Sequence, residues 1–195
     1  PVIMAEDADI DAALPKLLKG GFYHAGQVCV SVQRIFVHQS KAREVAVKLA
    51  EGAKQLRIGD PTLEQTEVGP LIRHAEVTRI AQWVDEAISE GAELLSGGQA
   101  LSDTTYAATV LLNPPASSKV STHEVFGPVV CVYGYDDVDE AIAQANALPW
   151  VFQAAVFTKD MKKAFKAYNT IQTGGVIIND FPSFRVENMP YGGVK

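Results

Sequence analysis

The chain has 195 residues, of which 47% are hydrophobic and 21% are charged, and its formal net charge is −6. This composition fits one globular domain with a sizeable core. The acidic balance, without a basic stripe, argues against nucleic acid as a partner, and no apolar run approaches membrane-spanning length. Residues 1–7 also lack the basic start and the apolar run of a signal peptide.

In chain order, hydrophobic periodicity predicts elements that alternate between strands and helices. After an initial strand, we expect a helix over 9–24, a strand over 33–38, helices over 40–56 and 73–90, strands over 93–95, 109–112 and 129–135, a helix over 137–146, a strand over 154–157, a helix over 160–169 and a strand over 175–179. Ser40 is the expected N-cap of the second helix, and Pro15 is a potential kink in the first.

This alternation predicts an α/β fold, with a mostly parallel twisted sheet covered by helices on both faces. The segment 129–135 is apolar on both faces, as expected for a buried parallel strand. In such sheets, active residues gather beyond the carboxyl ends of the strands. We therefore expect functional residues in the loops that contain Cys29, Glu124, Phe126 and the stretch 181–188.

Cys29 is the first candidate for chemistry. It follows Gly26-Gln27-Val28, just past a helix and just before an apolar run, where backbone N–H groups favour a thiolate nucleophile. The alternative is an inert, buried small hydrophobe, as most free cysteines are. Cys131 lies in a buried strand pattern, so two free thiols are expected rather than a disulfide. His24 and His74 are not at metal-ligand spacing with either cysteine, which predicts no metal site.

Three motifs occur in order along the chain: Phe-x-x-x-Gly-Gln-x-Cys at 22–29, Glu-x-Phe-Gly-Pro at 124–128, and Val176–Asn179 followed by Met-Pro-Tyr-Gly-Gly at 189–193. Together they resemble the aldehyde dehydrogenase superfamily over essentially the whole chain. The resemblance implies that residues 1–195 are the catalytic domain. The sequence begins without methionine and stops without a cap, so we expect an excised fragment. The cofactor-binding domain, general base, second oxyanion donor and oligomerisation tail would then lie outside it, leaving the fragment alone inactive.

The resemblance also implies a reaction and a cofactor. The parent enzyme would oxidise an aldehyde to a carboxylic acid with NAD or NADP, through a thiohemiacetal and a thioester on Cys29. The Cys29 backbone N–H would be one oxyanion donor. Glu124 would hold the nicotinamide ribose, Phe126 would pack beside the nicotinamide, and Arg79 would be a cationic cofactor contact. The alternatives are a surface carboxylate for Glu124 and a solvated helix face for Arg79.

For the substrate, the resemblance implies that 181–188 lines the aldehyde entry. Phe181 and Phe184 would form apolar walls, and Val28 and Val30 would shape the pocket around the thiol. Arg185 would pair with an anionic substrate tail, since guanidinium groups bind carboxylates well. This predicts small or acidic aldehydes, and the alternative is a surface salt bridge for Arg185.

The resemblance further implies that the parent enzyme is a homodimer or homotetramer, and we expect it in the cytoplasm. Two other functions stay open. Cys29 with His24 or His123 suggests a thiol hydrolase or acyltransferase, which would need no dinucleotide. The second alternative is a catalytically inactive homologue that keeps the fold. The sequence does not identify the aldehyde, and it does not choose between NAD and NADP because the residue that reads the 2′ position lies in the missing domain.

Overall fold

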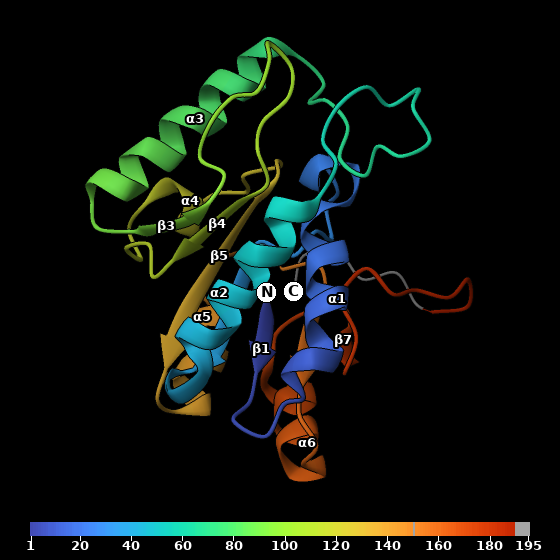
Figure 1. The fold of residues 1–195 in the computed structure, drawn as a ribbon. Helices are drawn as coiled ribbons and strands as arrows, with labels where there is room; N and C mark the ends of the chain where they lie inside the picture. Colours follow the sequence, from blue (N-terminus) through green and yellow to red (C-terminus); the bar gives the residue numbers. More distant parts are fainter. Residues whose placement is uncertain (150, 190–195) are drawn as a thin grey trace.

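The computed structural model describes residues 1–149 and 151–189 of the chain (Figure 1). Its strands are β1 (Val2–Met4), β2 (Arg34–His38), β3 (Glu93–Ser96), β4 (Thr109–Leu112), β5 (Val129–Tyr135), β6 (Ala154–Phe157) and β7 (Val176–Ile178). In the described residues these form one seven-stranded sheet in the order β3-β4-β5-β2-β1-β6-β7. Neighbouring strands are parallel except β3, which runs antiparallel to β4 at one edge.

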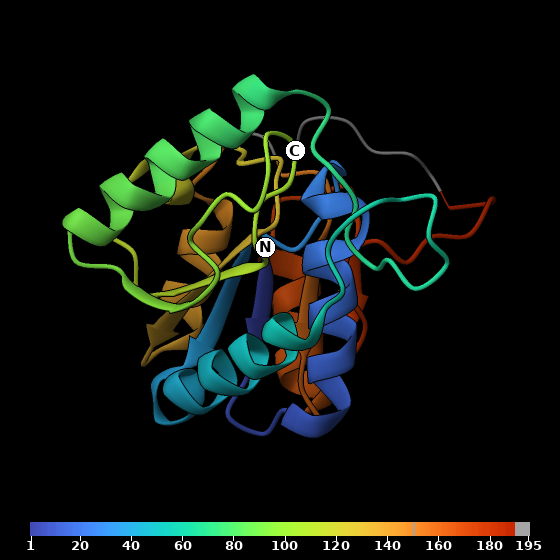
Figure 2. The same cartoon turned by 45° about the horizontal axis from the view of Figure 1, so that its top comes forward.

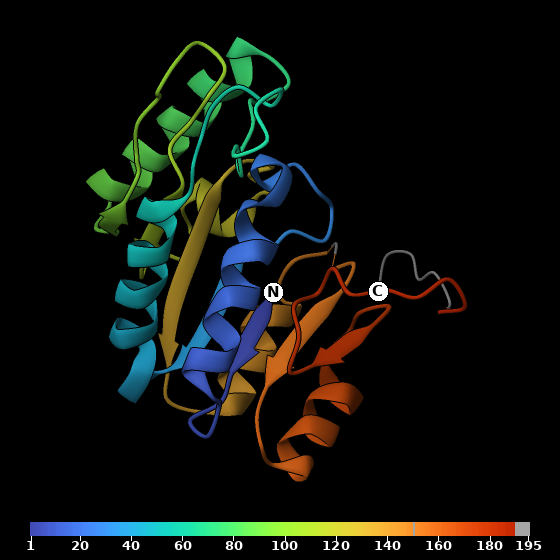
Figure 3. The same cartoon turned by 45° about the vertical axis from the view of Figure 1, so that its right-hand side comes forward.

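The helices are α1 (Ile10–Phe22), α2 (Gln39–Gln55), α3 (His74–Ser89), α4 (Lys119–Thr122), α5 (Val138–Asn146) and α6 (Met161–Thr170). Helices α1 and α2 cover one face of the sheet, and α5 and α6 cover the other (Figures 1 and 3). This arrangement follows from right-handed crossovers, because β1 leads to β2 in one direction along the sheet and β5 leads to β6 and β7 in the other. The α/β fold class predicted from the sequence is therefore confirmed.

Helix α3 lies at the β3–β4 end of the molecule, beside α4 (Figure 2). The buried face of α2 consists of small and branched side chains, such as Ala46, Ala50 and Val45, which let a helix approach a sheet closely. Strand β5 is buried along nearly its whole length, as its apolar run predicted. Within the described residues, no helix is both long and apolar enough to cross a membrane.

The expected elements are present, with ends shifted by at most two residues. Three details differ. Ser40 is not the N-cap of α2, because the helix already begins at Gln39 and the Ser40 hydroxyl pairs with His38 Nδ1 at 2.8 Å. Helix α1 continues through Pro15 to Phe22, where a short 3-10 turn, η1 (Tyr23–Gly26), follows. The four-residue helix α4 had no periodic signal in the sequence.

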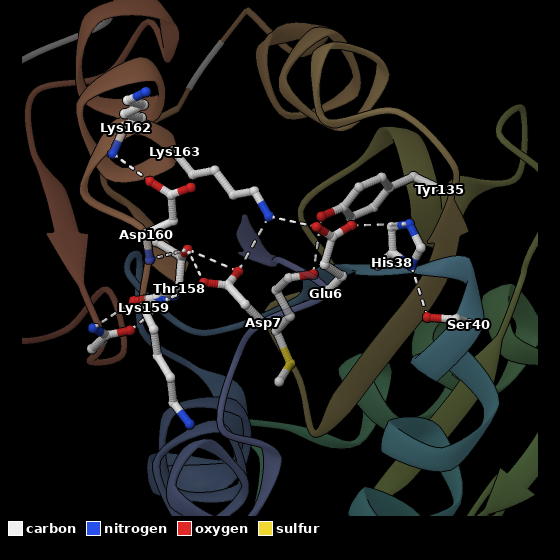
Figure 4. A network of polar contacts seen from close by, with 12 residues as sticks. Glu6, Asp7, His38, Ser40, Tyr135, Thr158, Lys159, Asp160, Lys162 and Lys163 are labelled. Carbon is white, nitrogen blue, oxygen red and sulfur yellow. Dashed lines mark hydrogen bonds and ion pairs between the residues drawn. The ribbon is translucent and has the colours of Figure 1, made fainter.

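A network of polar contacts lies at the carboxyl ends of β1, β2, β5 and β6 (Figure 4). The Asp7 carboxylate accepts hydrogen bonds from the Thr158 hydroxyl at 2.9 Å and from the Lys159 backbone N–H at 2.7 Å. Lys163 pairs with Glu6 at 2.8 Å and with Asp7 at 3.4 Å. Burial works against the charged form of Asp7, but these hydrogen bonds outweigh it and hold the pKa of its carboxyl below the ordinary value.

This network predicts a pH-dependent stability. Because the folded pKa of Asp7 lies below an unfolded value of about 3.9, its stabilisation is fully present above that pH and is lost as pH falls through the folded pKa. We expect Asp7→Asn to lower the free energy of unfolding by about 1–3 kcal/mol at pH 7. Urea unfolding of both proteins should show this difference narrowing toward pH 3.

The matched control is Asp136→Asn, at an exposed bend after β5. It should change the free energy of unfolding by less than about 0.5 kcal/mol at either pH. An Asp7→Asn protein as stable as the unchanged protein at pH 7 would contradict the role given to this carboxylate.

Candidate active site

A cavity of about 400 Å³ opens at the amino ends of the parallel strands. Its lining includes Cys29 and Gln33, which precede β2, Glu124 and Phe126, which precede β5, and Gln153, which precedes β6. The expectation that Cys29, Glu124 and Phe126 lie beyond the carboxyl ends is therefore wrong. The physical reason is that the chain's own polar network fills the opposite edge, whereas long loops at the amino edge leave a space between them.

The loop that carries Cys29, residues 23–33 and here called the Cys29 loop, begins with an unusual backbone. His24, Ala25 and Gly26 have positive φ angles of 51°, 55° and 71° in succession. Glycine is required at the last of these positions, because a Cβ at Gly26 would collide with the carbonyl group of Gly127. The Cys29 loop therefore turns sharply at Gly26, just before the thiol.

The Gln27 side chain holds the same loop in place. Its side-chain Nε2 donates to the carbonyl oxygens of His24 and Pro70, each at 3.2 Å, and its Oε1 accepts from the Ile72 N–H at 2.9 Å. The side chain thus joins the Cys29 loop to the segment that leads into α3. Its amide group is structural, since it is fully used in holding two pieces of backbone together.

Cys29 is an exposed, free thiol in the cavity, flanked by Val28 and Val30. Within residues 1–149 and 151–189, its backbone N–H makes no hydrogen bond. An exposed thiol with an unused N–H beside it has the two features that acyl chemistry requires, a nucleophile and a donor for a developing oxyanion. Cys131, in contrast, is fully buried in β5, and burial raises the pKa of its thiol to about 12.

Glu124 and Phe126 reach the same cavity from a second loop, residues 123–127, here called the Glu124 loop. Both side chains are exposed, whereas Val125 between them is 1% exposed and anchors the loop in the core. Phe126 has a positive φ of 51°, a strained conformation for a bulky residue. The cavity therefore brings together five residues singled out from the sequence: Val28, Cys29, Val30, Glu124 and Phe126.

Arg79 does not line this cavity. Its Nε pairs with Glu76 at 2.8 Å, its Nη2 donates to the Val125 carbonyl at 2.6 Å, and its guanidinium lies 4.4 Å from the centre of the Trp83 ring. Hydrogen bonds from Arg79 and then from Arg73 hold the pKa of Glu76 below its ordinary value. Arg79 thus meets the site through the backbone of the Glu124 loop, and a direct contact with a cofactor stays a prediction.

The stretch 181–188 lies beside the Cys29 loop, but its predicted residues do not line the cavity. Phe181 packs against Gly20 of α1. Phe184 is half exposed, and Arg185, also exposed, donates from Nη2 to the Met189 carbonyl at 2.7 Å. Roles for these three residues in substrate binding stay predictions. Residues 190–193 of the third motif lie outside the described residues.

Two polar residues near the thiol were missed from the sequence. Ser183 accepts a hydrogen bond from the Tyr23 hydroxyl at 2.8 Å and donates to the Val30 carbonyl at 3.2 Å, which ties 181–188 to the residue after Cys29. Gln33 binds the Glu124 loop. These bonds join residues about 90 to 160 positions apart, so no local spacing reveals them. In the sequence, Gln33 could have been noticed only as a polar residue directly before an apolar strand.

The histidines considered as partners of the thiol have other contacts. The His24 ring lies tilted against the Tyr23 ring, with centroids 5.1 Å apart. The His123 ring centroid lies 5.5 Å from that of Trp83, and His123 Nδ1 hydrogen-bonds with the Thr122 hydroxyl at 2.9 Å. In the part of the chain that the structure describes, neither hydrogen-bonds to Cys29. The same part contains no group of three or more His, Cys, Asp or Glu residues that could hold a metal ion.

Known proteins of one family are similar to this chain over nearly its whole length. The model of the aldehyde dehydrogenase family matches residues 1–195. The 3-sulfolactaldehyde dehydrogenase of Priestia megaterium is 43% identical over 193 residues, which cover 99% of this chain and 40% of the relative.

Two solved structures match all of this chain. Glyceraldehyde-3-phosphate dehydrogenase GapN from Methanocaldococcus jannaschii, complexed with NADP, aligns with a TM-score of 0.95, 37% identity and 42% of its own chain covered. Aldehyde dehydrogenase 21 from Physcomitrella patens, in complex with the reaction product succinate, aligns with a TM-score of 0.94, 38% identity and 40% coverage. The chain thus spans about two fifths of the length of these proteins.

The different environments of the two thiols predict selective alkylation. In the folded protein, iodoacetamide should modify Cys29 at least about 100-fold faster than Cys131, because only an accessible thiol with thiolate character reacts. In urea, both should react at similar rates. Mass spectrometry of the proteolytic peptides measures both rates, and equal labelling in the folded protein would contradict the structure.

Proposed function

Because the chain belongs to the aldehyde dehydrogenase family, we propose that the protein containing it oxidises an aldehyde to a carboxylic acid with NAD or NADP. Residues 1–195 are the catalytic domain in this proposal, with the main cofactor-binding domain and the oligomerisation tail elsewhere in the protein. The observation that carries it is the shared cavity of Cys29, Glu124 and Phe126. A thiol, a carboxylate and an aromatic ring there fit the reacting end of a nicotinamide nucleotide.

Cys29 is the nucleophile of the proposed reaction. Its thiolate adds to the carbonyl carbon, forming a C–S bond and an oxyanion that the Cys29 backbone N–H stabilises. A nicotinamide cofactor held by Glu124 and Phe126 would supply the hydride acceptor for this carbon, and loss of the hydride would leave a thioester on Cys29. Water then adds to the thioester, the C–S bond breaks, and the thiol is restored as the acid leaves. The base that activates this water lies, in this proposal, outside the chain.

Glu124 and Phe126 place the cofactor. The exposed carboxylate of Glu124 would accept hydrogen bonds from the nicotinamide ribose hydroxyls, and the Phe126 ring would pack against the nicotinamide end. Val28 and Val30 flank the thiol and shape the space for the aldehyde. Arg79 supports the cofactor site through the Val125 carbonyl, and a cationic contact of its own to the cofactor is part of the proposal.

The proposed substrate is a small aldehyde with an acidic group. Arg185, Phe181 and Phe184 on the stretch 181–188 contribute the entry, with the Arg185 guanidinium pairing with the anionic tail. Support comes from the relatives, whose names refer to 3-sulfolactaldehyde and glyceraldehyde-3-phosphate and to succinate as product. The protein is further proposed to be a homodimer or homotetramer in the cytoplasm, where reducing conditions keep a thiol such as Cys29 free.

The first test is cofactor reduction by the full-length protein. With NAD or NADP and a panel of aldehydes, Cys29→Ala should lower kcat by at least about 10³-fold, because the covalent step is lost. Cys131→Ala is the matched control and should keep kcat within about twofold, since that thiol is buried away from the cavity. A folded protein that reduces neither cofactor would favour a thiol hydrolase or an inactive homologue instead.

The second test concerns the acidic tail. Arg185→Ala should raise KM for an acidic aldehyde about tenfold or more, the effect of losing a charge-assisted pair, and should leave KM for an uncharged aldehyde of similar length unchanged. Arg185→Lys should recover only part of the loss, because an ammonium cannot make the bidentate contact. Equal KM values for the acidic aldehyde with and without Arg185 would remove this residue from the substrate site.

A further inference from the structure

Gln33 joins the Cys29 loop to the Glu124 loop. It is the last residue of the Cys29 loop before β2, and it lines the cavity. Its Nε2 group donates to the carbonyl oxygens of Val120 at 3.0 Å and His123 at 2.8 Å, and its Oε1 accepts from the Val125 N–H at 2.9 Å. Both N–H groups and the oxygen of this side chain are thus bound to backbone around Glu124.

Val125, between Glu124 and Phe126, is consequently fixed at its N–H, its carbonyl and its side chain. The Val125 N–H is bound by Gln33, its carbonyl is bound by Arg79 at 2.6 Å, and its side chain is buried. A fixed Val125 leaves its two neighbours exposed in the cavity. Phe126 also has a strained positive φ of 51°, and such a conformation persists only where the surroundings enforce it.

We infer that Gln33 is a positioning residue that sets the Glu124 carboxylate and the Phe126 ring relative to the Cys29 thiol. Because Gln33 follows the thiol by four residues in the same loop, any shift of the Glu124 loop is coupled to the loop that carries the nucleophile. Gln33 acts through Glu124 and Phe126 and does not itself touch the cofactor. This inference rests on the proposed contact of Glu124 with the nicotinamide ribose.

The test measures cofactor affinity in the full-length enzyme. Gln33→Leu keeps a similar volume and removes all three hydrogen bonds. Titration with NADH or NADPH, followed by fluorescence, should give a dissociation constant raised about tenfold, a loss of about 1.4 kcal/mol. KM for the oxidised cofactor should rise by a similar factor, while alkylation of Cys29 without cofactor stays within about twofold because the thiol remains exposed.

Gln27→Leu is the matched control. Gln27 is also a glutamine of the Cys29 loop with three backbone hydrogen bonds, but these hold His24, Pro70 and Ile72 rather than the Glu124 loop. It should lower the melting temperature about as much as Gln33→Leu and change the cofactor dissociation constant by less than about threefold. Equal weakening of cofactor binding by both variants would reduce Gln33 to a purely structural residue and overturn the inference.

A second variant gives a readout that loss of packing would not produce. In Gln33→Glu, an ionised carboxylate still accepts from Val125 but faces the carbonyl oxygens of Val120 and His123 without a proton to donate. Protonation restores a donor, so cofactor affinity should recover as pH falls from 8 toward 6, beyond any change in the unsubstituted enzyme. A pH profile parallel to that of the unsubstituted enzyme would contradict the positioning role.

Glu124→Ala distinguishes a failure of the proposed ribose contact from a failure of the role given to Gln33. If Glu124→Ala leaves cofactor affinity unchanged, both the proposed ribose contact and the role of Gln33 are wrong. If Glu124→Ala weakens binding and Gln33→Leu does not, only the role of Gln33 is wrong. If both substitutions weaken cofactor binding, the variant that combines them should lose less affinity than the product of the two separate losses, because Gln33 acts through Glu124. A fully multiplicative loss would show independent action and overturn the inference.

Discussion

The close contact between Gly26 and the Gly127 carbonyl is the constraint on which the site depends. It is possible only because Gly26 has no Cβ and adopts a positive φ. The contact brings the Cys29 loop against the Glu124 loop before the thiol, and Gln33 joins the same two loops after it. Cys29 therefore lies in a segment fixed at both ends to its neighbour, so the thiol and the carboxylate share one cavity without belonging to one element.

The carboxyl and amino edges of the sheet differ in how their polar side chains are partnered. At the carboxyl ends of β1 and β6, Asp7 bonds to the Lys159 backbone after β6, and Lys163 of α6 pairs with Glu6 and Asp7 after β1, so these charges are paired within the chain. At the amino ends, the side chains of Cys29 and Glu124 stay exposed. The carboxyl edge, where ligands usually bind in open α/β sheets, thus holds charges that are paired with one another. The amino edge holds the exposed thiol and carboxylate.

Much of the fold was predictable because the strands are apolar and the helices are periodic, both of which are local signals. Cys29, Glu124 and Phe126, which line one cavity, could be singled out from the sequence because they belong to short motifs. Their location at the amino ends was not predictable, because ligands in open α/β sheets usually bind beyond the carboxyl ends, whereas this cavity lies between the loops that precede β2, β5 and β6. Gln33 and Ser183 were missed because their partners lie about 90 and 160 positions away and no spacing records such bonds.

The most direct test of the amino-edge site is a crystal structure of the full-length enzyme with bound NAD or NADP. The account predicts the nicotinamide ribose hydroxyls within hydrogen-bond distance of Glu124, the nicotinamide against Phe126, and the Cys29 thiol facing the ring. It is contradicted if the nicotinamide end lies at the carboxyl edge, near Asp7 and Lys163, or anywhere that Cys29 cannot reach.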